Sequence, residues 1–324
     1  MEFSLDPLPE GFVFYKPLQR EAYDESTIFE LEKKRKLIIT RKRDGWKLIA
    51  VKSGKGWKVY TDSTREVTER LPHIKKELDN LEIPENSMLI GEGIVDLDGN
   101  DNFLGVGSVF NSKPQKSLEM QRQNGLVKFM VFDIAFWEGR CSLSQPYSSR
   151  LENIQRVLAK GKPGYVMPLT VVDAAFNEAK NMVRNSGWEG LVLYDKDFTA
   201  SIRLDGKSPK RPEGCYKWKP VFEDDFIVRE WIPQDKDPAK LKEVVLLQID
   251  PVTKKEFDCG RLGSFSGETR RKIKEILEGG TGPAVLQVGF EIRFSSGKLR
   301  NKWFIRIRED KSWRNCLAPK SFTN

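Results

Sequence analysis

The residue with the clearest potential for covalent chemistry is Lys42, which stands two positions before the pair Asp44-Gly45. A lysine amine attacks phosphorus or a carbonyl carbon when desolvation or neighbouring cations lower its pKa. Arg41 and Arg43 flank Lys42 and are expected to act in that direction. The alternative is structural, because an Asp-Gly pair between two apolar runs is a strong hairpin signal. Lys42 would then be a solvated lysine at a strand end.

Further charged and aromatic residues follow Lys42 in an order that fits nucleotidyl transfer. Glu92 and Glu189 could supply carboxylates for a divalent cation or bind a ribose. Phe132 offers an aromatic face for a purine. Basic residues that could stabilise charge on a transferring phosphorus, or close over a leaving pyrophosphate, are Lys217, Lys219, Arg308 and Lys311. Taken singly, each of these residues also has an ordinary interpretation as part of a strand edge, a core or a wet surface.

The scarcity of histidine excludes several kinds of active site. The sequence has 1 histidine, His73, whereas Ser-His-Asp, Cys-His and histidine-ligated metal sites each need at least one. We expect His73 to be an ordinary surface or half-buried residue. The 4 cysteines form no Cys-x-x-Cys pair, which argues against a zinc ribbon, a thioredoxin-like site and a disulfide scaffold. Any chemistry must therefore use lysines, arginines, carboxylates and hard cations.

Length and charge set the remaining bounds. A chain of 324 residues is comfortable for two domains. The net charge of +8 suits a polyphosphate-binding surface, although many basic proteins bind no nucleic acid. No apolar run is long enough to span a bilayer, and residues 1–6 lack the features of a secretory signal. The scattered cysteines make a reducing, cytosol-like compartment the default expectation.

The elements that must position these residues are predicted as an α+β domain followed by a smaller β domain. Helices are expected at 25–36, 67–81, 150–158 and 173–184, and strands at 37–39, 48–51, 57–61, 87–96, 127–136, 190–194 and 216–218. Residues 98–125 show no clear periodicity and are predicted to be a loop. From 226 onward, strands at 226–232, 243–250, 256–261 and 284–294 with one helix at 267–277 suit a Greek-key barrel of OB type. The predicted domains are 1–221 and 222–324.

The order of the motifs resembles the covalent nucleotidyltransferase superfamily, which contains ATP-dependent polynucleotide ligases and mRNA capping guanylyltransferases. The matching stretches are Lys42-Arg43-Asp44-Gly45, Gly91-Glu92, Val131-Phe132-Asp133, Glu189-Gly190, Lys217-Trp218-Lys219 and Arg308-Glu309-Asp310-Lys311. The resemblance covers about residues 36–314. The segments 259–263 and 297–311 look most like a compact DNA ligase of viral or bacterial type. The implied fold is a nucleotidyltransferase (adenylation) domain of antiparallel sheets with flanking helices, followed by an OB-fold barrel.

The resemblance implies a three-step reaction that uses ATP with Mg²⁺, or Mn²⁺ as a substitute. Lys42 would form a lysyl-AMP intermediate, AMP would pass to the 5′-phosphate of a nick in duplex DNA, and the 3′-hydroxyl would displace it. Glu92 and Glu189 would bind ribose and metal, and Phe132 would stack on adenine. Lys217 and Lys219 would hold the α-phosphate. The residues implied to orient the pyrophosphate, on an OB domain that swings between steps, are Arg308, Asp310 and Lys311.

The family's Ser-Arg box, which is implied to contact ribose and the nick, is not matched in this sequence. Where ligases carry the arginine of that box, the chain has Thr61-Asp62, and Arg65 is the expected substitute for binding ribose and the nick phosphate. The other expected contacts to nucleic acid are Arg41, Arg43 and Arg300.

Two alternatives to DNA ligation remain open at this point. RNA joining or guanylyl transfer to RNA ends would use the same lysine chemistry, and Lys217-Trp218-Lys219-Pro220 also resembles capping enzymes. A non-catalytic OB-fold protein that binds nucleic acid belongs to a different class. We expect a stand-alone, monomeric, cytoplasmic enzyme of a bacterium or a virus-infected cell, without membrane partners, that serves DNA replication, repair and recombination.

Overall fold

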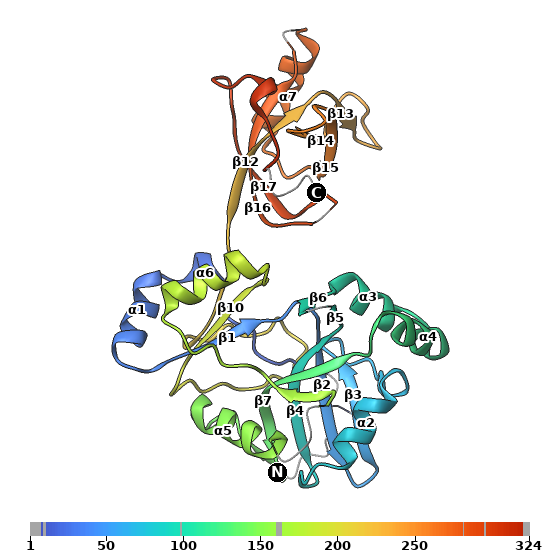
Figure 1. Ribbon diagram of the computed structural model, residues 1–324, viewed down its shortest axis with the longest axis vertical. Coiled ribbons are helices and arrows are strands. Elements are labelled where there is room, and N and C mark those ends of the chain that lie inside the picture. Colours follow the sequence, from blue (N-terminus) through green and yellow to red (C-terminus); the bar gives the residue numbers. More distant parts are fainter. Residues whose placement is uncertain are drawn as a thin grey trace. The chain divides into compact units, whose positions relative to one another are not determined.

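The protein is described here from a computed structural model, in which residues 8, 11–97, 99–159, 164–280, 282–294 and 296–319 are described. The chain divides into two compact units, Met1–Lys219 and Pro220–Asn324 (Figure 1). The predicted division lay two residues later, after 221. Residues 1–6, for which a secretory signal was not expected, lie outside the described residues.

The smaller sheet of the first unit is antiparallel and has the order β1-β10-β11. Its strands are β1 (Leu37–Lys42), β10 (Gly190–Asp195) and β11 (Cys215–Trp218). Two helices, α1 (Glu25–Lys33) and α6 (Phe176–Ser186), pack on it (Figure 1). Their apolar faces share a core with the sheet that includes Ile28, Phe176 and Trp218. The helix α6 ends where Gly187 takes a left-handed conformation, φ 66°, the residue type that best tolerates it.

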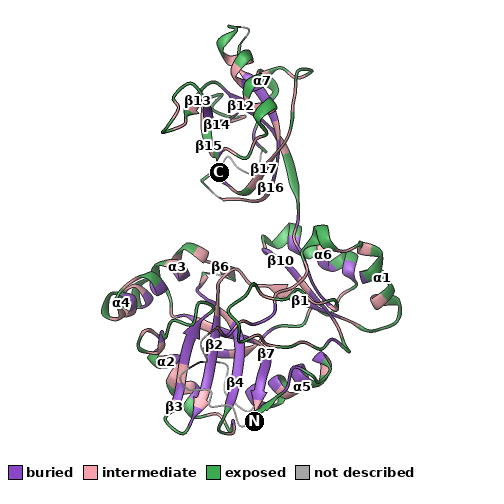
Figure 2. Cartoon of the chain, turned by 180° about the vertical axis from the view of Figure 1, so that it is seen from behind, coloured by how far each residue is buried: buried purple, intermediate pink, exposed green. Residues whose placement is uncertain are grey.

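The larger sheet has the order β3-β2-β4-β7-β8, with β9 parallel to β7. Its strands are β2 (Trp46–Ser53), β3 (Gly56–Thr61), β4 (Ser87–Ile94), β7 (Lys128–Trp137), β8 (Arg140–Cys141) and β9 (Val166–Pro168). Figure 2 shows its central strands buried. Successive side chains of a strand point to opposite faces, so Leu48 and Ala50 enter one core while Ile49 and Val51 enter another.

Helices cover one face of this larger sheet, and the N-terminal segment covers the other together with Tyr147 and Leu151. The core beneath α2 (Pro72–Asp79) contains Ile74 and Leu78 from that helix. The opposite core contains Phe14 and Tyr15 from the N-terminal segment. Other helical elements of the first unit are η1 (Arg20–Ala22), η2 (Thr68–Arg70) and α5 (Tyr147–Leu158).

The prediction of a loop at 98–125 is wrong, because this segment contains two helices. They are α3 (Phe103–Asn111) and α4 (Pro114–Asn124), and they follow a short hairpin of β5 (Asp96–Leu97) and β6 (Asn100–Asp101). Two glycines within α3 lower its helix propensity. The helix is held instead by burial of Val106, Val109 and Phe110 in the core and by the Asn102 side chain, which accepts a hydrogen bond from the Gly105 amide at 2.9 Å. Tertiary packing overrides the local signal.

The second unit is a small antiparallel β domain with one α-helix among its described residues, and the predicted α+β fold class with an OB-type second domain is confirmed. Its sheet has the order β13-β14-β12-β16-β17, with β15 pairing with β14. Ser266 caps the helix, as its residue type favours. The last strand, β17, was not among those predicted. The elements are β12 (Phe222–Val228), β13 (Trp231–Pro233), β14 (Leu241–Ile249), β15 (Glu256–Leu262), α7 (Gly267–Glu278), β16 (Ala284–Arg293), β17 (Leu299–Ile307) and η3 (Trp313–Asn315).

Among the described residues, no helix combines the length and the apolar character that crossing a membrane requires.

Candidate active site

Three of the residues singled out in the sequence meet at one end of the smaller sheet. Lys42 is the last residue of β1 and pairs with Gly190, so Glu189 directly precedes the paired segment of β10. The neighbouring strand β11 ends one residue before Lys219. The Glu189 carboxylate accepts a hydrogen bond from the Lys42 ammonium through one oxygen and forms an ion pair with Lys219 through the other, at 2.9 Å. The register of the strands thus brings Lys42, Glu189 and Lys219 together.

Glycine is required directly after Glu189 for a steric reason. A Cβ atom on Gly190 would lie 2.3 Å from the Trp218 carbonyl oxygen, far inside any permitted contact. A side chain at this position would therefore push β11 away from β10, and Lys219 would lose its place beside Glu189.

The hairpin interpretation of Asp44-Gly45 is wrong. The strand β1 pairs with β10, whereas β2 pairs with β3 and β4, so residues 43–45 carry the chain from one sheet to the other. A Cβ atom on Gly45 would lie 2.3 Å from the Gly93 carbonyl oxygen. The glycine is therefore needed for a close approach to β4 and not for a two-residue turn. Lys42 is not a solvated strand-end lysine, since its side chain is 24% exposed and ion-paired.

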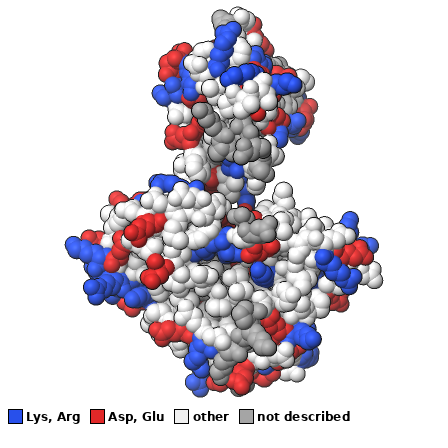
Figure 3. Space-filling model, viewed as in Figure 1, with Lys and Arg blue, Asp and Glu red and all other residues white. Residues whose placement is uncertain are grey.

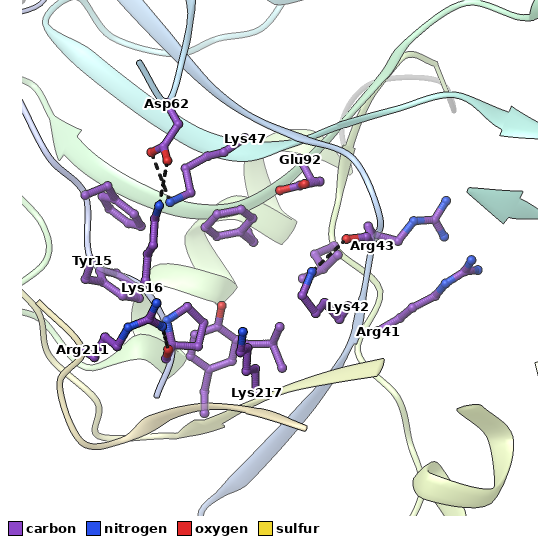
Figure 4. Close-up of a pocket in the computed structure, with 16 residues that line it drawn as sticks. Tyr15, Lys16, Arg41, Lys42, Arg43, Lys47, Asp62, Glu92, Arg211 and Lys217 are labelled. Carbon is purple, nitrogen blue, oxygen red and sulfur yellow. Dashed lines mark hydrogen bonds and ion pairs between the residues drawn. The ribbon is translucent and has the colours of Figure 1, made fainter. Parts of the chain in front are cut away.

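The larger sheet supplies the other wall of the site. Lys47 on β2 lies opposite Glu92 on β4, and Glu92 lies opposite Met130 on β7. Phe132 is two residues beyond Met130 and so shares its face. Lys47, Glu92, Phe132 and Lys42 line a cavity of about 280 Å³, together with Lys217 of β11. Figure 4 shows Glu92 and Lys42 on the same side of this cavity.

Part of the cavity comes from residues that the sequence analysis did not select. The N-terminal segment contributes Phe14, Tyr15 and Lys16, and the loop before β11 contributes Arg211. The only sequence signal for this wall is the aromatic run in residues 12–15, which reads equally well as core. Phe14 and Tyr15 are almost completely buried, and both line the cavity.

Asp62 stands in the cavity where the resemblance led us to expect an arginine. Its two carboxylate oxygens pair with Lys16 at 3.1 Å and with Lys47 at 3.4 Å (Figure 4). Burial would raise the pKa of Asp62, but the two lysines outweigh it and the pKa is lowered. Arg65, the expected substitute, is exposed and donates a hydrogen bond to the Phe110 carbonyl at 2.8 Å. It is not among the residues that line the cavity.

The electrostatics of Lys42 differ from the expectation. Burial lowers its pKa, but the carboxylates of Glu189 and Glu92 outweigh burial, so the pKa is raised above its usual value of 10.5. The expected lowering by flanking arginines is therefore wrong for the free site. Burial also raises the pKa of Glu92 to about 7, even though Lys42 and Lys47 act in the opposite direction. The pKa of Glu189 is lowered, because Lys42 and Lys219 outweigh its burial.

Arg41 and Arg43 are among the residues that line the cavity, but their guanidinium groups point away from it (Figure 4). Their guanidinium groups pair with Asp101 of β6, at 3.4 Å and 2.8 Å respectively. The Arg41 guanidinium also lies 4.9 Å from the centre of the Trp188 ring. Their expected contacts to nucleic acid stay a prediction.

Four predicted residues belong to the second unit. There Arg308 and Lys311 both pair with the buried carboxylate of Asp225, at 3.0 Å and 2.6 Å. Arg308 also pairs with Asp310 at 2.8 Å, which lowers the pKa of Asp310 to about 2. Arg300 lies on β17 and is half-buried.

The carboxylates of the cavity suit a hard cation better than a transition metal. No cluster of three or more histidine, cysteine, aspartate or glutamate side chains that could hold a metal occurs within the described ranges. Mg²⁺ needs only one or two protein carboxylates when phosphate oxygens supply other ligands. Glu189 already faces two lysines, whereas the raised pKa of Glu92 marks a carboxyl group whose negative charge is poorly compensated. The donor set therefore fits a divalent cation bound together with a nucleotide.

His73 and the cysteines take no part in this site. His73 is half-buried and its ring nitrogen lies 2.9 Å from the Val127 carbonyl oxygen, as an ordinary structural residue. All four cysteines are free thiols.

Comparisons with known proteins agree on one family. The family model described as the ATP dependent DNA ligase domain matches residues 19–217. No curated protein sequence matches the chain. One solved structure is that of a Lig E DNA ligase, described as binding DNA with a minimal scaffold. Its TM-score is 0.61 at 16% sequence identity, and the match covers 91% of this chain and 99% of that one.

Two further solved structures have the same fold. The structure named Pmar-Lig_PreS3 has a TM-score of 0.63 at 17% identity, over 91% of this chain and 68% of that one. The ATP-dependent DNA ligase of bacteriophage T7 in complex with ATP has a TM-score of 0.50 at 16% identity, over 94% of this chain and 99% of that one.

Proposed function

Because the chain belongs to the family of ATP-dependent DNA ligases, we propose that it seals nicks in duplex DNA by way of AMP bound covalently to Lys42. The enzyme is a nucleotidyltransferase that uses ATP and joins DNA ends. The observation that carries the role of Lys42 is its position in the cavity, where it faces Glu189 and lies beside Glu92, Phe132 and Lys217. The family match favours DNA joining over RNA joining, capping or non-catalytic binding.

In the first step, the Lys42 ammonium releases a proton to solvent and the neutral amine forms an N–P bond to the α-phosphorus of ATP. The bond to pyrophosphate breaks, pyrophosphate leaves, and the nitrogen loses its second proton to solvent. Lys217 and Lys219 would stabilise the charge on the transferring phosphoryl group. Phe132, on the wall of the cavity, would stack on adenine. Glu189 would hold the Lys42 side chain in place before the nucleotide binds.

Glu92 and Glu189 are the residues that would hold Mg²⁺, with Mn²⁺ as a substitute. A cation there would neutralise the two carboxylates that raise the pKa of Lys42, which favours the nucleophilic neutral amine, and would offset the charge of the triphosphate. In the later steps AMP passes to the 5′-phosphate of the nick and the 3′-hydroxyl displaces it.

The remaining roles concern pyrophosphate and DNA. Arg308, Asp310 and Lys311 would orient the pyrophosphate in the first step, and Arg41, Arg43, Arg65 and Arg300 are proposed phosphate contacts to DNA. Figure 3 shows basic side chains gathered near the middle of the visible face of the first unit. Such a surface binds the DNA backbone without sequence preference. We also propose that the enzyme acts as a monomer in the cytoplasm.

The test is label transfer from α-labelled ATP or GTP with Mg²⁺, followed by denaturing electrophoresis and by sealing of nicked DNA and RNA duplexes. Lys42→Ala should abolish the label from ATP. Lys36→Ala is the matched control, because Lys36 lies just before β1 and forms an ion pair with Asp197 away from the cavity. Label from GTP alone would support capping instead, and sealing confined to RNA would support an RNA ligase. Unchanged labelling of Lys42→Ala would refute the assignment of the nucleophile.

A further inference from the structure

One buried carboxylate holds the backbone and side chains on both sides of Lys42. The side chain of Asp101 is 4% exposed, and it pairs with Arg43 at 2.8 Å and Arg41 at 3.4 Å. The same carboxylate accepts a hydrogen bond from the Asp44 amide at 3.0 Å. Asp101 therefore contacts the residue before Lys42 and the two residues after it.

The geometry of an extended chain explains why these contacts matter for Lys42. Successive side chains of a strand point to opposite sides, so Arg41 and Lys42, the last two residues of β1, point in opposite directions. Arg43 follows the strand, and its side chain lies on the same side as that of Arg41 (Figure 4). Holding the two arginines on one side therefore fixes the direction in which the Lys42 ammonium leaves the backbone, toward Glu189. The stacking of Arg41 against Trp188 adds a second anchor on the same side.

The charges show that this arrangement depends on Asp101. Each of the two arginine side chains is 11% exposed, and burying two like charges together is costly unless a carboxylate compensates them. Asp96, on the other strand of the hairpin, lies 3.7 Å from Arg43 and is shared with Lys128 at 3.5 Å. It makes no hydrogen bond to the Lys42 segment among the described contacts.

We propose that Asp101 is a positioning residue for the nucleophile: it orients Lys42 by clamping Arg41, Arg43 and the Asp44 amide. The proposal rests on the proposed role of Lys42. It assigns the arginines beside Lys42 a function in holding this segment, and it gives the β5–β6 hairpin a part in the first step of the reaction.

The experiment measures two steps separately: adenylylation, in which Lys42 is the nucleophile, and sealing of an adenylylated nick, in which it is not. Asp101→Ala removes both the charge and the acceptor, and Asp101→Asn keeps an acceptor for the Asp44 amide. Misplacing a reacting group by about 1 Å costs on the order of 100-fold in rate. We expect Asp101→Ala to lower the single-turnover rate of Lys42 adenylylation by about that factor, with a smaller loss for Asp101→Asn and little change in the KM for ATP. Sealing of a nick that already carries AMP should stay near the wild-type rate.

Asp96→Asn is the matched control, because it removes the same charge from the same hairpin without touching the Asp44 amide. It should leave adenylylation close to wild type. Arg43→Gln should slow adenylylation, and combining it with Asp101→Asn should cost less than the sum of the two changes, since both remove one interaction.

The outcomes distinguish this inference from the proposed function. Equal losses in adenylylation and in sealing of the adenylylated nick, with a lower melting temperature, would mean that Asp101 only stabilises the fold, and would overturn the inference. Normal adenylylation in Asp101→Ala would overturn it as well. Unchanged labelling of Lys42→Ala would refute the nucleophile itself, whatever the Asp101 variants do.

Discussion

The carboxylate of Glu189 contacts the ammonium group of Lys42 at the end of β1, where Lys42 pairs with the residue directly after Glu189. The contact is fixed by strand register, because the two residues lie on neighbouring antiparallel strands. In the free site it keeps the proposed nucleophile oriented and, by raising the pKa of Lys42, also protonated.

Replacing Glu189 with Gln should separate these two effects. The amide cannot raise the pKa of Lys42, so the acid limb of the pH profile of kcat/KM for adenylylation should move to lower pH. The maximal rate should fall, because the oriented ion pair and a proposed metal ligand are lost. Rapid-quench measurements of lysyl-AMP formation across pH test this. An acid limb that stays in place would contradict the coupling between Glu189 and Lys42.

Glu92→Gln should stabilise the fold in a pH-dependent way. The pKa of Glu92 is raised to about 7 from an ordinary value of 4.5, so its contribution to stability is full below pH 4.5 and is lost as the pH rises through 7. The neutral variant does not lose it. At pH 8 it should be more stable than wild type by up to about 3 kcal/mol, and at pH 4.5 nearly equal. Urea unfolding at the two pH values measures the difference, and a pH-independent difference would contradict the raised pKa.

Asp62→Asn should lower the stability of the fold by removing a charge from the wall of the cavity. Without this charge, Lys16 and Lys47 face each other uncompensated, and the already lowered pKa of Lys47 should fall further. Because Asp62 is partly exposed, we expect a loss of about 1 kcal/mol, smaller at high salt. Asp197→Asn, in an exposed pair with Lys36 away from the cavity, is the control and should change little. Equal effects of the two variants on stability would argue against a special role for Asp62.

Asp225→Asn should destabilise the second unit. Its buried carboxylate compensates both Arg308 and Lys311, and breaking a buried pair on one side costs about 3–5 kcal/mol. Asp310→Asn removes a carboxylate that also pairs with Arg308 but is 66% exposed, so its effect should be small. Calorimetry of the two variants tests the contrast. A similar melting temperature for both would show that Asp225 does not hold this cluster.

Much of the fold could be predicted because local pattern and packing agree. The strands around Lys42, Glu92 and Phe132 carry apolar runs of the right length, and Gly187 and Ser266 are the residue types that end and begin helices. The helices α3 and α4 could not be predicted, because glycines and polar residues hide a buried face that only the tertiary core reveals.

The candidate site was predicted in part, for a similar reason. Lys42, Glu92, Phe132 and Lys217 stand on or at the ends of strands, and the structure brings them to one cavity. Asp101 lies in a segment predicted to be a loop, and Lys16 lies far from every motif, so neither could be placed without the sheet pairing. Arg41 and Arg43 were expected to lower the pKa of Lys42. This expectation failed because Asp101, a residue distant in sequence, holds their guanidinium groups on the side away from the Lys42 ammonium.

The central claim is that Lys42 carries AMP, and peptide mapping tests it most directly. The protein is incubated with ATP and Mg²⁺, digested at neutral pH, and its peptides are sequenced by mass spectrometry. The account predicts AMP on Lys42 through an acid-labile phosphoramidate, and no such adduct in Lys42→Arg. AMP on another lysine, or nick sealing by Lys42→Arg with ATP, would contradict it.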